Sequence, residues 1–209
     1  ISIGDRSITG MVVRDQYVGR YQVPVADCAV TASALVALDG QPMTGEAMSM
    51  GERTPVALIN PSASARLAVA EAITNIAGAN IAKLSDITLS ANWMAATGED
   101  KEDQALYEGV MAVGEALCPA LGIAIPVGKD SLSMRANWTD EAGNKSVVSP
   151  MSLVITAFAP VQNVSKTLTP ELTAGETAFY RLDLSKGQFR LGGSILAQTL
   201  SQLGDSCPD

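Results

Sequence analysis

The stretch NPSASARLAVAEAITNIAGANIA, residues 60–82, is the segment around which the rest of the chain is organised. Pro61 suits the first turn of a helix, where its missing N–H group has no helical partner to lose. Ser62 or Ser64 could cap the start with a hydroxyl oxygen. The apolar positions repeat at helical spacing and predict a buried stripe formed by Leu67, Ala70, Ile73, Ala77 and Ile81. We therefore expect one long helix that packs against a core.

Two polar residues interrupt this small and apolar background. Glu71 and Asn75 are four residues apart, so their side chains lie on one face of the helix, one turn apart. A carboxylate and an amide oxygen in this arrangement could share a hard cation such as Mg²⁺. The alternative is an ordinary polar flank, with Glu71 in water and Asn75 in a hydrogen bond. The residues of the helix leave both interpretations open.

A third acidic candidate lies earlier in the chain. Asp27 is the only charged residue in the run PVADCAV at residues 24–30. A carboxylate among small apolar residues must be exposed, hydrogen-bonded or bound to a cation, because burying it unpaired is costly. Asp27 is about equally compatible with a cap or turn and with a ligand role.

A glycine follows the apolar run LGIAIPV at residues 121–127, which predicts a buried strand. Gly128, Lys129 and Ser131 follow this strand directly. A glycine turn with a lysine and hydroxyl groups could cradle a phosphate, although the spacing of a P-loop is missing. An ordinary polar turn is the competing interpretation.

The remaining segments predict an α+β fold with a mixed sheet, because hairpins occur as well as crossovers. The helices are expected at 103–117 and 194–203. The strands are expected at 7–14, 21–25, 86–94, 149–159 and 176–184, with a hairpin turn at 140–145 and a loop or lid at 35–49.

The composition excludes several functions. The net charge of −8 argues against binding nucleic acid, and the chain has no histidine, which excludes a histidine base or histidine-ligated zinc within it. The odd number of cysteines, three, fits a reducing compartment, and with no predicted membrane span or signal peptide we expect a cytoplasmic protein. Charged residues make up only 17% of the chain, which suggests that more chain or a partner covers part of its surface, although an alanine-rich composition alone can produce the same value. The chain begins at Ile1 and stops just after a predicted helix, which suggests a piece of a longer protein.

Several strings together resemble the large single-chain phosphoribosylformylglycinamidine synthase (FGAM synthase) family. They cover most of residues 4–135: GDRSITGMVVRDQYVG at 4–19, VPVADCAVTAS at 23–33, GERTPVALINPSASARLAVAEAITNIA at 51–77, LSANWMAA at 89–96 and EALCPALGIAIPVGKDSLSMR at 115–135. The length and order of these strings favour this family over selenophosphate synthetase or thiamin-monophosphate kinase. The loop at 35–44 looks longer than the family would have.

The resemblance implies a domain organisation. The family's synthase core is a duplicated unit with the aminoimidazole-ribonucleotide-synthetase-like fold, whose N-terminal domains pack together like a dimer. The chain looks like the second N-terminal domain at residues 1–162, a linker at 163–173, and the truncated start of a C-terminal α/β domain at 174–209. Its implied partners are the remaining domains of the same chain, including a glutaminase domain, and the isolated chain is expected to form a weak homodimer.

The resemblance also implies an activity. The family uses ATP and glutamine to convert formylglycinamide ribonucleotide to formylglycinamidine ribonucleotide in purine biosynthesis, with Mg²⁺ as cofactor. In the large synthases the second-half nucleotide site is auxiliary and holds ADP, and the first half supplies the catalytic histidine. The chain is therefore either a contributor to an active synthase or a structural ADP–Mg²⁺ module, and alone it is expected to be inactive.

The family pattern assigns roles to individual residues. Asp27, Glu71 and Asn75 resemble its Mg²⁺ ligands, and the Ala26 backbone would lie against the nucleotide. Residues 128–131 resemble a Gly-Asn-x-Ser segment of smaller relatives. Gly128 would then contact nucleotide, and Ser131 the ribonucleotide substrate. Lys129 replaces the asparagine and is carried over only as a phosphate contact, since a protonated lysine cannot coordinate a metal.

Overall fold

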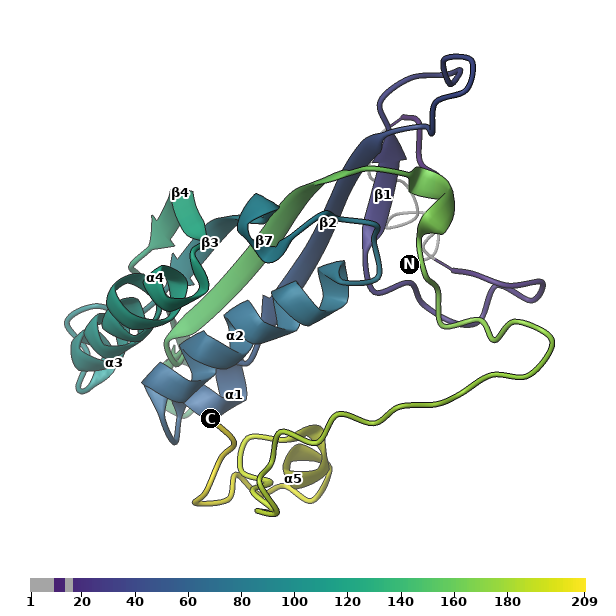
Figure 1. Ribbon diagram of the computed structural model, residues 1–209. Coiled ribbons are helices and arrows are strands. Elements are labelled where there is room, and N and C mark those ends of the chain that lie inside the picture. The colour runs from purple at the N-terminus through teal and green to yellow at the C-terminus, as the bar shows by residue number, and fades with distance from the viewer. Residues whose placement is uncertain (1–9, 14–16) are drawn as a thin grey trace.

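The computed structural model describes residues 10–13 and 17–209 and contains a five-stranded sheet (Figure 1). The strand order is β1-β2-β7-β3-β4. Neighbouring strands are antiparallel except for β3 and β4, which are parallel. The strands are β1 (Ala29–Ala32), β2 (Gly45–Glu52), β3 (Thr88–Met94), β4 (Ala124–Ser131) and β7 (Ser152–Val161). This mixed sheet with its helices confirms the predicted α+β class.

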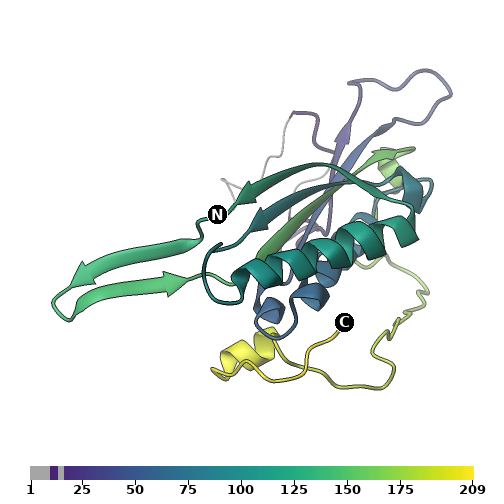
Figure 2. The same ribbon diagram turned by 90° about the vertical axis from the view of Figure 1, so that its left-hand side faces the viewer.

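Helices cover one face of this sheet (Figure 2). The central helix α2 (Pro61–Ile76) packs on β2 and β7, and it also contacts α3 (Glu102–Val110). The chain continues from α3 through a π-helical stretch η2 (Met111–Leu117) into α4 (Cys118–Leu121). The remaining short helices are α1 (Thr54–Ala57), η1 (Leu84–Asp86) and η3 (Val164–Lys166). None of the described helices is long and apolar enough to cross a membrane.

The strand β2 and the helix α2 approach each other unusually closely. Alternate residues of β2 are small and face the helix: Gly45, Ala47, Ser49 and Gly51 are all buried. A Cβ atom at Gly51 would overlap the Ala68 carbonyl oxygen and lie 2.5 Å from the Ala72 nitrogen. The Ser49 hydroxyl group donates to the Ala72 carbonyl oxygen at 2.6 Å. Small residues on β2 therefore fix α2 directly above the strand.

The loop predicted at 35–49 is confirmed for residues 35–44, which form neither helix nor strand, but it is wrong for residues 45–49, which belong to β2. The stretch GEAMSMGE alternates small and larger residues, as a strand does. The glycine, proline and methionine residues of the stretch 35–49 predict a loop, whereas Ser49 and Gly51 of β2 are the small residues that a closely packed helix requires.

The central helix begins where it was predicted but ends at Ile76, six residues before the predicted end at residue 82, and two further details were wrong. Asn60 is the N-cap, accepting from the Ala63 N–H group at 3.0 Å, whereas the hydroxyl groups of Ser62 and Ser64 donate to other carbonyl oxygens. The predicted stripe is rotated, because Ala70 and Ala77 are exposed. The buried positions are Ala63, Ser64, Ala65, Ala68, Val69, Ala72 and Ile76.

The other predicted elements had mixed outcomes. The strands at 86–94 and 149–159 are confirmed as β3 and β7, and the hairpin at 140–145 joins β5 (Arg135–Asp140) to β6 (Gly143–Val148). This hairpin projects away from the sheet (Figure 2). The helix at 103–117 is confirmed, but it continues to Leu121, because Pro119 occupies the first turn of α4.

Two predicted strands are wrong. Residues 21–25 form a turn with one isolated bridge between Val25 and Tyr17, and residues 176–184 form neither strand nor helix and are exposed. Most of the strand predicted at 7–14 lies outside the described residues. The helix at 194–203 is confirmed in part as α5 (Ile195–Thr199), with Ser194 as its cap. The domain boundaries at 162 and 173 stay a prediction.

Candidate functional site

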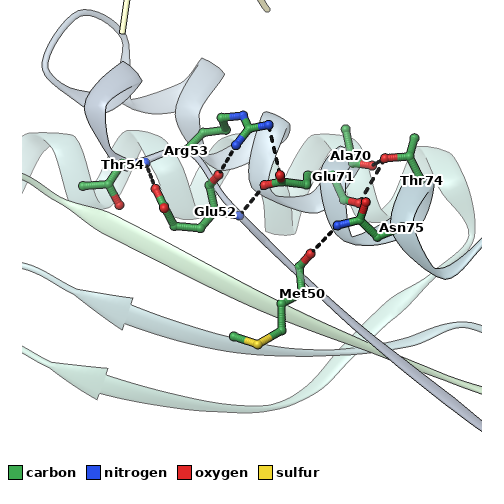
Figure 3. A network of polar contacts seen from close by, with 8 residues as sticks. All are labelled: Met50, Glu52, Arg53, Thr54, Ala70, Glu71, Thr74 and Asn75. Atoms are coloured by element: carbon green, nitrogen blue, oxygen red, sulfur yellow. Dashed lines mark hydrogen bonds and ion pairs between the residues drawn. The ribbon is translucent and has the colours of Figure 1, made fainter. Parts of the chain in front are cut away.

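A polar network joins the end of β2 to the solvent side of α2 (Figure 3). One carboxylate oxygen of Glu71 accepts from the Glu52 backbone N–H group at 2.8 Å. Its other oxygen pairs with the Arg53 guanidinium group at 3.0 Å. Arg53 also donates to the Glu52 carbonyl oxygen at 3.0 Å. The Glu71 carboxylate is thus held at one end of the sheet by the Glu52 backbone amide and the Arg53 guanidinium group.

Asn75 belongs to the same network, one turn further along α2 (Figure 3). Its amide nitrogen donates to the Met50 carbonyl oxygen at 2.9 Å. This bond orients the side chain through its nitrogen, so the amide oxygen is the end that remains suited to a cation. The packing of α2 on Gly51 is what brings both polar side chains over β2.

Asp27 lies two residues before β1 and is exposed. In the β1–β2 pairing Ala29 is opposite Met48, so the same register carried two residues further would place Asp27 opposite Met50. The neighbouring Cys28 lies near the end of α2, because a Cβ atom at Gly78 would be 3.6 Å from its sulfur. Burial, and then the charge of Asp27, raise the pKa of the Cys28 thiol. Asp27 and Asn75 therefore approach the same end of the helix.

The donor set of Asp27, Glu71 and Asn75 fits Mg²⁺ in its chemistry, since all three offer oxygen atoms. The Arg53 guanidinium group competes with a cation for Glu71. In the described part of the chain no three His, Cys, Asp or Glu residues are grouped so that they could hold a metal ion. Binding a cation with all three residues therefore requires that Glu71 exchange Arg53 for the metal.

The segment Gly128–Ser131 forms the end of strand β4, so the predicted turn is wrong. It pairs with β3, where Ala91 is opposite Gly128 and Asn92 is opposite Lys129. A Cβ atom at Gly128 would lie 3.0 Å from the Ala91 carbonyl oxygen. Residues 128–131 are of types that favour turns, but they are extended here because β3 supplies hydrogen bonds to them. The Lys129 ammonium group donates to the Ser131 hydroxyl oxygen at 2.6 Å.

Sequence reasoning missed Asn92, which lies opposite Lys129 on β3. Its side-chain oxygen is buried and has no hydrogen-bond partner within the described residues. The alternation of Ser90 and Asn92 with apolar residues in TLSANWM was the signal that could have found it.

The candidate metal ligands on α2 and the candidate phosphate contacts on β4 lie in different places. Register pairs place Glu52, Val154, Asn92 and Lys129 in one row across β2, β7, β3 and β4. Three steps between strands separate the ends of this row, which is roughly 14 Å. The structure brings Glu71 and Asn75 together and Lys129 and Ser131 together, but it does not merge the two pairs into one small pocket. Ala26 is half-buried beside Asp27.

Residues 1–160 match a family model described as the FGAR-AT PurM_N-like domain. Phosphoribosylformylglycinamidine synthase II from Thermotoga maritima is 21% identical, covers 69% of this chain and 21% of that chain, and has a TM-score of 0.48. T. maritima PurL complexed with ADP is 19% identical, and the match covers 76% of this chain and 26% of that chain with a TM-score of 0.48. A chain of a HypE–HypF complex is 16% identical, with coverages of 69% and 39% and a TM-score of 0.41. This chain thus spans well under half of the length of each.

Proposed function

Because this chain belongs to the FGAR-AT PurM_N-like domain family, we propose that it is part of a synthase that uses ATP and glutamine to make formylglycinamidine ribonucleotide. Its fold would be that of an aminoimidazole-ribonucleotide-synthetase-like N-terminal domain, followed by the start of a C-terminal domain at residue 174. The support comes from the family match over residues 1–160 and from the strings between residues 4 and 135.

Within this proposal, Asp27, Glu71 and Asn75 hold Mg²⁺ and through it the phosphates of ATP or ADP. The observation that carries this assignment is the close contact of α2 with β2, which fixes Glu71 and Asn75 beside residues 50–53. Mg²⁺ would gather the phosphates and offset their charge. The chain itself orients the ligands through the backbone groups of Glu52 and Met50, and the Ala26 backbone would lie against the nucleotide.

The strand segment Gly128–Ser131 is the proposed contact for substrate and phosphate. Because Gly128 has no side chain, the backbone of β4 can lie close to the Ala91 carbonyl oxygen of β3. Lys129 is exposed and its ammonium group is already oriented by Ser131. An exposed, oriented cation suits a phosphate oxygen, and the Ser131 hydroxyl group suits a ribonucleotide substrate.

A second candidate function is a structural ADP–Mg²⁺ module without turnover. The absence of histidine from the sequence favours this role for the chain alone. We propose that the remaining domains, a glutaminase domain included, complete the enzyme in the cytoplasm, and that these 209 residues alone do not catalyse amidation. Detecting ATP-dependent amidation by the chain alone would refute this.

Calorimetric titration of ADP with Mg²⁺ tests the metal assignment. We expect Asp27→Asn and Glu71→Gln to weaken binding by at least about tenfold, because each removes a charged ligand of the cation. Glu46→Gln is the matched control, since Glu46 is an exposed carboxylate on the same strand β2 but at its opposite end. Equal binding by all three variants and the unmodified chain would reject the assignment.

A further inference from the structure

One side of the helix that runs from α3 through η2 into α4 is uncovered. Its first two parts contact α2, and its end contacts β4. The residues that the helix buries are Ala105, Gly109, Ala112, Val113 and Cys118. Figure 2 shows no described element over the opposite side. We call this open side the outer face of the helix.

Exposed apolar side chains follow one another along the outer face. Tyr107 is 64% exposed, Val110 42% and Met111 39%. Val110 and Met111 come three and four residues after Tyr107, so all three lie on one side of the helix. Gly114 continues this row and has nothing within 4 Å of an added Cβ atom, so it leaves room beside the larger side chains. Tyrosine and methionine are enriched in the cores of protein interfaces, so this apolar row suits contact with another protein.

A carboxylate lies at each end of the apolar row. Asp103 comes four residues before Tyr107, Glu115 comes four residues after Met111, and both carboxylates are exposed. Asp103 accepts from the Gly98 backbone N–H group, but neither acid belongs to an ion pair among the described residues. The two carboxylates are roughly 18 Å apart along the helix axis. The outer face therefore offers two negative charges separated by apolar surface.

The charges of this stretch all have the same sign. Residues 102–128 contain no lysine or arginine. Their acidic residues are Glu102, Asp103, Glu108 and Glu115. A second copy of the chain would bring the same acids onto this face, and like charges that oppose each other across an interface are unfavourable. Charge complementarity therefore favours a basic partner over a second copy.

The winding of the helix is a second, independent observation. The stretch η2 is π-helical over Met111–Leu117, so it carries Met111, Gly114 and Glu115 of the outer face. π-helical segments are rare and occur frequently at functional sites. The proposed nucleotide and substrate contacts do not account for it, because they lie before β1, on α2 and on β4.

We propose that the outer face binds a basic amphipathic helix of a partner protein. Apolar side chains of the partner pack on Tyr107, Val110 and Met111, which is the usual arrangement when an amphipathic helix docks on an apolar surface. Lysine or arginine residues about three turns apart in the partner meet Asp103 and Glu115. This surface is separate from the proposed function, because none of its residues is a candidate nucleotide, metal or substrate contact.

Titration calorimetry of the 209-residue chain with two synthetic helical peptides tests the proposal. Both peptides have about 16 residues and the same row of leucines at helical spacing, flanked by lysines in one peptide and by glutamates in the other. We expect the lysine peptide to bind at least about tenfold more tightly, because only its charges complement Asp103 and Glu115. Equal binding of the two peptides, or no binding of the lysine peptide, would overturn the proposal.

Two charge variants separate this face from the general acidity of the chain. Glu115→Lys and Glu141→Lys change the net charge equally, but Glu141 is exposed in the turn between β5 and β6. We expect Glu115→Lys to weaken binding of the lysine peptide by about tenfold, because it replaces an attraction with a repulsion. Glu141→Lys should change it by less than about twofold, since distant surface charges are screened. Equal effects would mean that net charge alone attracts the peptide, which contradicts the proposal.

A second pair of variants tests the apolar contact. Val110→Ser should weaken binding severalfold, because apolar contact area is lost. Val147→Ser is the matched control, since Val147 is an exposed valine of the β5–β6 hairpin, and it should leave binding unchanged. Equal effects of the two would contradict docking on the outer face. Self-association in sedimentation that Val110→Ser abolishes would assign this face to a second copy and overturn the proposal.

Discussion

The close contact between β2 and α2 makes Gly51→Ala the most informative single substitution. The added methyl group would overlap the Ala68 carbonyl oxygen, and it would lie 2.5 Å from the Ala72 nitrogen and 3.0 Å from the Glu71 Cβ atom. Two of these atoms are helix backbone, which cannot turn aside as a flexible side chain can. The strand and the helix must therefore move apart.

The size of the effect follows from two contributions. Overpacking of a well-filled interface costs about 1–3 kcal/mol. Separation also weakens the buried bond from the Ser49 hydroxyl group to the Ala72 carbonyl oxygen, which contributes about 1 kcal/mol. We expect Gly51→Ala to lower the free energy of unfolding by about 2–4 kcal/mol and the Tm by about 5–15 °C.

Urea unfolding followed by circular dichroism measures this loss. Gly114→Ala is the control, because Gly114 is an exposed helical glycine with nothing within 4 Å of an added Cβ atom. That substitution should stabilise the chain by up to about 1 kcal/mol through helix propensity. If Gly51→Ala were as stable as the unmodified chain, the inference that α2 is fixed by small residues on β2 would be wrong.

Three other substitutions test the site, a buried acid and the open sheet. Arg53→Gln should strengthen Mg²⁺ binding severalfold in calorimetry, because it frees Glu71; weaker binding would mean that Arg53 supports the cation. Burial raises the pKa of Glu102, so its folded form favours the proton, and the chain should lose stability as pH rises above the ordinary value of 4.5. Glu102→Gln should be more stable than the unmodified chain at pH 7 and lose this advantage at pH 4 in urea unfolding; an advantage that is the same at both pH values contradicts this. If the chain forms the weak homodimer that the family resemblance implies, Phe158→Glu should abolish it in sedimentation, because Phe158 is 39% exposed on the sheet face opposite α2; an unmodified chain that is monomeric at high concentration would contradict the dimer.

The periodic parts of the fold were predictable, and the parts set by long-range packing were not. The helix predicted at 60–82 and the strand predicted at 149–159 carry their own patterns, so both were found, although the helix ends at Ile76. The strand β2 was missed because its small residues reflect the approach of α2, a contact between positions 51 and 68 that local sequence does not encode. Gly128, Lys129 and Ser131 read locally as a turn, but pairing with β3 extends them. Segment 176–184 resembles a strand but has no partner strand in the described structure.

The metal-ligand role of the candidate residues stays a prediction, but the electrostatics around them could not be predicted at all. Glu71 and Asn75 became candidates through their spacing and Asp27 through its apolar surroundings, and the family resemblance favoured the ligand role. The guanidinium group that holds Glu71 was not, because Arg53 is 18 positions away and reaches the helix only through the end of β2. Asn92 was missed for a related reason. Its place in the alternating strand is visible in the sequence, but its unpartnered buried oxygen is a property of the folded structure.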